Sequence, residues 1–180
     1  SAQEDQWTGN ATNLSKGNLR VNSSGRYLEY SDGTPFLYMG DTAWELISRL
    51  NDKETELYLE NRREKGFTVI QTVILDELDD MDVSSNGEPK LIDGNIDKPA
   101  PDYFTHVDKV ISLAAAKGLY IALLPTWGDK VDKQWGKGPE IFTPENAYRY
   151  GKWLGERYMN ASNLIWIIGG DRSGDGKNFA

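Results

Sequence analysis

Residues 67–75 read FTVIQTVIL, a continuous apolar run that is rich in β-branched side chains. Such a run is typical of a strand that is covered on both faces, as in a parallel sheet. Gly66 comes directly before it and ends a polar segment with a helix-like pattern at residues 51–65. A helix that stops at a glycine and leads into a buried strand predicts an α/β fold.

The same order recurs along the rest of the chain. Gly118 ends a second helical pattern and leads into another apolar run. Alternating strands and helices predict a parallel sheet with right-handed crossovers. The strands are expected at residues 36–40, 67–75, 119–124 and 164–168, and the helices at residues 51–65, 102–117 and 143–159.

Two architectures fit this alternation, an open doubly wound sheet and a barrel. Open sheets that bind nucleotides usually carry a glycine fingerprint after the first strand, whereas residues 40–44 read GDTAW. Long polar loops with tryptophans follow the strands, where barrel enzymes build their sites. A complete barrel needs roughly 250 residues, and this chain has 180. We therefore predict the N-terminal half of a (β/α)8 TIM barrel, with four parallel strands in sequence order and an exposed edge on either side.

A short antiparallel β-ribbon is expected before the barrel. Residues 19–21 and 27–30 flank the turn residues 22–25, a pattern that indicates a hairpin. Residues 1–18 are polar and aperiodic, so we expect a flexible N-terminal segment there. Residues 19–180 are then the first half of a catalytic barrel domain that stops after its fourth strand.

Composition excludes several classes of function. The net charge of −8 and the pI of about 4.7 disfavour nucleic acid as a partner. The chain has no cysteine, which excludes thiolate chemistry. Its one histidine, His106, has no His or Cys partner, so we expect neither a metal site nor a Ser–His arrangement built on it. No apolar run has the length of a membrane span. The acidic stretch at residues 76–82 lacks the spacing of an EF-hand, which favours a solvated loop. We expect no metal and no cofactor.

The sharpest candidate for catalysis is Asp171. It follows Gly169-Gly170 at the end of the expected fourth strand, the position that lies at the mouth of a barrel site. Glycoside hydrolysis needs a carboxylic acid that protonates the leaving oxygen, and Asp171 is suited to that role. An equally simple interpretation is an aspartate that caps a loop or pairs with Arg172.

Other polar and aromatic residues also follow strand ends. Asp41 and Trp44 come after the first strand, and Trp127 and Asp129 come after the third. Together they are expected to line one rim, with indole faces that stack on sugar rings and carboxylates that accept hydroxyl hydrogen bonds. The alternative is that both tryptophans only pack under loops. Gln71, Glu77 and Arg172 complete the residues that we expect to contact substrate.

Five segments resemble the apiosidase-like glycoside hydrolases, barrel enzymes of gut and soil bacteria that digest plant polysaccharides. These segments are DGTPF at 32–36, GDTAW at 40–44, KGFTVIQ at 65–71, ALLPTWG at 122–128 and WIIGGD at 166–171.

The resemblance implies an acid/base after strand four and a nucleophile after strand seven. Asp171 falls on the first position, where many related barrel families have Glu, and no residue of this chain reaches the second. It also implies a secreted, periplasmic or cell-surface protein whose signal peptide has been removed, and an activity similar to the release of apiose from pectin side chains.

Three hypotheses for function follow. The first is a glycoside hydrolase that cleaves glycosidic bonds in plant cell-wall (pectin-like) polysaccharide, with Asp171 as general acid/base and the nucleophile on the remaining half of the barrel. The second is a non-catalytic carbohydrate-binding module, and the third is an inactive fragment that folds only with its other half. A glutamate at the end of a seventh strand, downstream of Ala180, would favour the enzyme.

Overall fold

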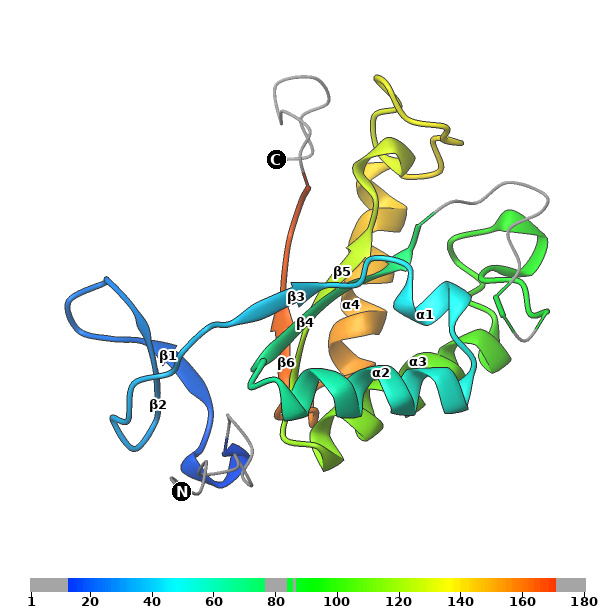
Figure 1. Cartoon of the computed structure of the whole chain (residues 1–180). Helices are drawn as coiled ribbons and strands as arrows, with labels where there is room; N and C mark the ends of the chain where they lie inside the picture. The colour runs from blue at the N-terminus through cyan, green and yellow to red at the C-terminus, as the bar shows by residue number, and fades with distance from the viewer. Residues whose placement is uncertain (1–12, 77–83, 86, 171–180) are drawn as a thin grey trace.

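A computed structural model describes residues 13–76, 84–85 and 87–170. Its centre is a four-stranded parallel sheet in the order β3-β4-β5-β6, and helices cover one face of that sheet (Figure 1). The strands are β3 (Gly40–Thr42), β4 (Val69–Leu75), β5 (Tyr120–Thr126) and β6 (Leu164–Trp166). All three pairings are parallel and follow sequence order. The chain therefore has the predicted fold class, the first half of a (β/α)8 barrel.

The helices begin and end close to where the sequence indicates. They are α1 (Leu46–Arg49), α2 (Asp52–Glu64), α3 (Pro101–Ala116) and α4 (Pro144–Arg157), and single 3-10 turns lie at η1 (Leu14–Lys16), η2 (Ile92–Gly94) and η3 (Gly128–Lys130). Asn51 caps α2 in a capping box with Glu54, and Thr143 caps α4 in the same way. The short helix α1 was not predicted. None of the described helices is long and apolar enough to span a bilayer.

The expected ribbon is present as β1 (Leu19–Val21) paired antiparallel with β2 (Leu28–Tyr30). It lies beside the amino-terminal end of the sheet (Figure 1). Side chains of the ribbon region and of the inner face of the sheet form a small apolar cluster that contains Tyr30, Phe36, Val69 and Tyr120. The ribbon thus covers part of the face that the helices leave open.

Side chains alternate between the two faces of the sheet, as the pleat requires. Ile70, Ile74, Ile121 and Leu123 belong to the main core, which α2, α3 and α4 close on the outer face. Val69 and Ala122 project to the inner face instead. Because the strands are parallel, the loops at the carboxyl ends of β3, β5 and β6 lie at the same end of the sheet.

The first strand differs from the prediction of residues 36–40. The structure begins it at Gly40, because Phe36 turns into the inner cluster, with ring centroids 5.5 Å from Tyr30 and 5.2 Å from Tyr120. The next backbone groups bond to Thr68, whose hydroxyl donates to the Leu37 carbonyl at 2.7 Å. Regular pairing starts only where Gly40 meets Val69.

The fourth strand also differs from the buried run that was expected at residues 164–168. It is regular over Leu164–Trp166, and both Trp166 and Ile168 are exposed. Among the described residues, β6 pairs with β5 and with no strand on its other side. An edge strand has fewer neighbours to cover its side chains, which explains the exposure.

Candidate functional site

An open pocket of about 1200 Å³ lies at the carboxyl ends of the parallel strands. This is the end of the sheet at which (β/α)8 enzymes place their sites. Its lining comes from the β3–α1 segment and α1, from one residue each of α2, β4 and β5, from the loop after β5 and from the segment after β6. The lining residues are Ala43, Trp44, Glu45, Leu46, Arg49, Leu50, Tyr58, Gln71, Leu124, Trp127, Asp129, Trp135, Gly136, Lys137, Ile167, Gly169 and Gly170.

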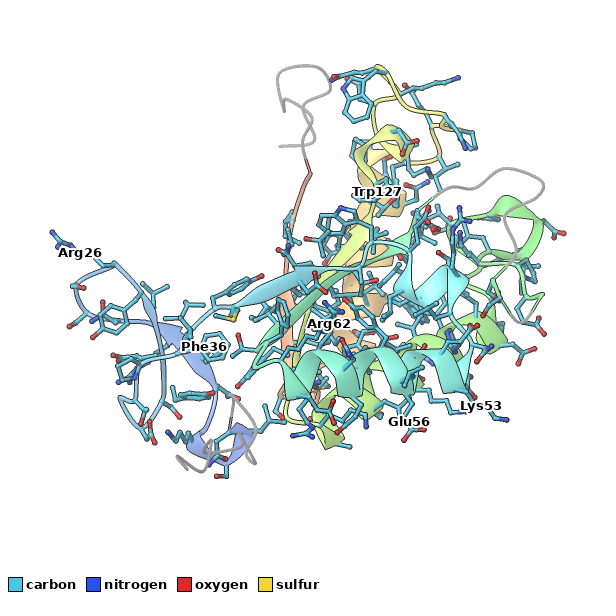
Figure 2. The ribbon with its side chains drawn as sticks, in the orientation of Figure 1. Arg26, Phe36, Lys53, Glu56, Arg62 and Trp127 are labelled. Carbon is cyan, nitrogen blue, oxygen red and sulfur yellow. The ribbon has the colours of Figure 1, made fainter. Side chains whose placement is uncertain are left out.

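Two tryptophans that the sequence singled out meet in this pocket. The rings of Trp44 and Trp127 lie edge to face, with centroids 5.2 Å apart, and Figure 2 shows Trp127 at the upper end of the sheet. Strand β4 fixes both backbones, since Val73 N donates to the Trp44 carbonyl at 3.2 Å and Trp127 N donates to the Leu75 carbonyl at 2.9 Å. Both side chains are partly buried. They therefore pack on each other and still present indole surface to the pocket.

Gln71 lies on the inner face of β4 and also lines the pocket. Its amide nitrogen donates to the Thr42 hydroxyl at 3.0 Å, and its amide oxygen accepts from the Tyr38 hydroxyl at 3.2 Å. Burial raises the pKa of Tyr38, which keeps this hydroxyl protonated as a donor. Tyr38 and Thr42 thus hold the Gln71 amide in place, and of the three side chains only that of Gln71 lines the pocket.

Asp41 was predicted to line the rim of the site, but it does not face the pocket. It lies within β3, where the pleat turns its side chain to the helix-covered face. There Oδ2 accepts from the Tyr58 hydroxyl at 2.7 Å and from Arg62 Nη1 at 2.9 Å. Burial, with the hydrogen bond to Asp41, raises the pKa of Tyr58 well above its usual value. The carboxylate thus ties α2 to the sheet, and only Tyr58 of this group lines the pocket.

Asp129 lines the pocket, but its carboxylate is engaged within the protein. Asp129 is 3% exposed, Oδ1 accepts from Lys130 Nζ at 2.9 Å and Oδ2 accepts from Gly138 N at 3.0 Å. The loop at residues 131–141 is held to the end of β5 by these contacts. Asp129 is therefore placed to shape the wall of the pocket rather than to accept sugar hydroxyls.

Three of the predicted site residues, Glu77, Asp171 and Arg172, lie outside the described residues. The segment that leads to Asp171 is described, and both Gly169 and Gly170 line the pocket. No group of three His, Cys, Asp or Glu side chains within residues 13–76, 84–85 and 87–170 is arranged to hold a metal ion.

The structure adds residues that the sequence did not single out. Trp135 projects from the loop after β5 and lines the pocket. At the end of β4, the buried Asp76 accepts hydrogen bonds from Ser48 and from the buried Lys90. The ion pair with Lys90 ties the β4–α3 connection to the strand end, and the hydrogen bond from Ser48 ties α1 to it. Neither feature has a signal in the sequence. Trp135 lies in a polar loop without periodicity, and the partners of Asp76 lie 28 and 14 residues from it.

Comparison with known proteins decides the family. The family model described as apiosidase-like, catalytic domain, matches residues 22–179. The chain belongs to the apiosidase-like family. Its apiosidase-like domain superimposes on a solved structure named glycoside hydrolase with a TM-score of 0.80 at 38% identity. A glycoside hydrolase family 5 protein from Bacteroides vulgatus ATCC 8482 is similar at 32% identity, also with a TM-score of 0.80.

The apiosidase-like domain spans about a third of these two relatives. The comparisons cover 91% and 92% of this chain but 36% and 35% of the other chains. An endo-1,4-beta-mannanase from Rhizomucor miehei shares the fold with a TM-score of 0.59 at 14% identity. No curated protein sequence matched the chain.

Proposed function

We propose that this protein is a glycoside hydrolase that cleaves glycosidic bonds in plant cell-wall, pectin-like polysaccharide. The observation that carries the proposal is the pocket at the carboxyl ends of the strands, where Trp44 and Trp127 form an aromatic pair beside Gly169 and Gly170. Aromatic faces suit the C–H faces of sugar rings, and the fixed amide of Gln71 suits a hydroxyl. Membership of the apiosidase-like family supports a carbohydrate substrate.

Asp171 is the proposed general acid/base. It directly follows Gly170, which lines the pocket. In the bond-breaking step a protonated carboxyl gives its proton to the departing glycosidic oxygen while positive charge develops on the sugar ring. A second carboxylate is needed as nucleophile or as base for water. We propose that a later strand, on the remaining half of the barrel, carries it. Export of the enzyme to the cell surface or beyond would bring it to such a substrate.

The first test is hydrolysis by the full-length protein. Pectin and its side-chain fractions are the substrates, and released sugars are measured by chromatography. We expect wild type to release sugar and Asp171→Asn to release far less. The control Asp102→Asn, at an exposed position on α3 that does not line the pocket, should behave like wild type. The isolated 180-residue chain should release none. Binding of the fractions without any release would favour the carbohydrate-binding module and contradict the enzyme.

A further inference from the structure

A third tryptophan in the pocket, Trp135, differs from the other two in its exposure. Trp44 and Trp127 are partly buried against each other, whereas Trp135 is 64% exposed although it lines the same pocket. It lies on the loop after β5, which extends beyond the end of the sheet (Figure 1). An indole that stays exposed at the border of a concave site offers a flat apolar face and a polar N–H edge to a ligand there.

The loop that carries Trp135 is held at both of its ends. Ile141 N donates to the Lys130 carbonyl at 2.8 Å, a bond that joins the two ends to each other. On either side of the indole, Lys133 N donates to Glu140 Oε1 at 2.8 Å and Gly138 N donates to the buried Asp129. These bonds fix the backbone around Trp135. A ligand that stacks on the indole therefore does not have to order a free loop, which lowers the entropic cost of binding.

We propose that Trp135 is the platform of a second sugar-binding position, outward from the Trp44–Trp127 pair. The occupant is a further sugar unit of the same oligosaccharide, since an indole offers a flat apolar face to the C–H face of a ring. Gly136 and Lys137 line the pocket beside it, which places a backbone segment and a cationic side chain next to the indole. This inference rests on the proposed function, because it needs a carbohydrate in the pocket.

The consequence is a preference for longer substrates. A side chain that binds only the outer unit contributes to affinity and leaves the bond-breaking step unchanged, so its loss raises KM without lowering kcat. The full-length enzyme should be assayed with two probes, a pectin side-chain tetrasaccharide and the glycosyl fluoride of the sugar that it releases. The fluoride fills the inner position alone.

Trp135→Ala should lower kcat/KM on the tetrasaccharide about tenfold, equivalent to about 1.4 kcal/mol, through KM. The fluoride should be hydrolysed at the wild-type rate. Trp135→Phe should keep most of the affinity, since it retains an aromatic face. Tyr148→Ala is the matched control, because Tyr148 is 73% exposed on α4 and does not line the pocket. An unchanged KM for the tetrasaccharide, or an equal loss on both probes, would overturn the inference while the hydrolase proposal stands.

If wild type hydrolyses neither probe, a binding measurement tests the inference instead. Tetrasaccharide binding is then measured by tryptophan fluorescence. Binding that Trp135→Ala weakens and Tyr148→Ala does not would support the outer position in a protein that is not a hydrolase. Binding that is equal in all three proteins, or absent from all of them, would overturn the position itself.

Discussion

Removing the carboxylate of Asp129 should destabilise the protein strongly. Lys130 is fully buried and its ammonium group donates to Asp129. Asp129→Ala leaves this charge without its partner and leaves Gly138 N without its acceptor. Breaking a buried ion pair by removing one member costs about 3–5 kcal/mol. We expect the free energy of unfolding of the full-length protein to fall by about that amount, measured by urea unfolding at pH 7.

A double-mutant cycle separates the charge from the loss of packing. Lys130→Met in the Asp129→Ala background removes the unpaired ammonium while keeping an apolar side chain of similar length. The double variant should recover at least half of the lost stability, because an apolar replacement of a buried pair is often neutral or better. If Asp129→Ala costs no more than an exposed substitution, or if Lys130→Met makes it worse, the assignment of a buried, mutually dependent pair is wrong.

Two further predictions concern α2. Hydrogen bonds from Arg63 and Lys117 lower the pKa of Glu60 from 4.5 to about 2, so these interactions stabilise the fold above pH 4.5 and are lost as the pH falls through about 2. Glu60→Gln should therefore lower the free energy of unfolding by roughly 1 kcal/mol or less at pH 7, since the side chain is partly exposed. In urea, the free energies of unfolding of wild type and variant should converge near pH 2. A constant difference down to that pH would contradict the assignment. Leu59→Ala, at a fully buried position, should cost about 2–5 kcal/mol, whereas the exposed Leu57→Ala should stay within about 0.5 kcal/mol of wild type; equal losses in urea would place Leu59 outside the core.

The elements that the sequence predicted well are those with strong local signals. Gly66 and Gly118 take positive φ values of 81° and 73°, the left-handed backbone that glycine adopts at low cost after a helix. Asn51 and Thr143 satisfy free amides at helix starts through their side chains. The continuous apolar runs became the central strands β4 and β5, which have a neighbour on both sides.

The parts that the sequence did not predict depend on register and on distant contacts. Beginning the first strand at Gly40 rather than at residue 36 puts Asp41 inside β3, and the pleat then sends its carboxylate to α2. Asp129 is buried together with its partners Lys130 and Gly138, and the Gly138 contact joins residues nine positions apart, for which the sequence has no local signal. Trp135 lies in a polar loop without periodicity, so its position on the pocket wall follows from the fold alone.

The central claim is that Asp171 delivers a proton to the leaving group, and the leaving-group dependence of Asp171→Asn tests it most directly. The full-length wild type and variant are compared on a pectin side-chain oligosaccharide and on a dinitrophenyl glycoside of the released sugar. Loss of a general acid typically costs about 10²–10⁴-fold when the departing oxygen must be protonated, so we expect that loss on the oligosaccharide and a far smaller one for bond cleavage in the aryl glycoside. Near-normal turnover of the oligosaccharide, or an equal loss on both substrates, would contradict the account.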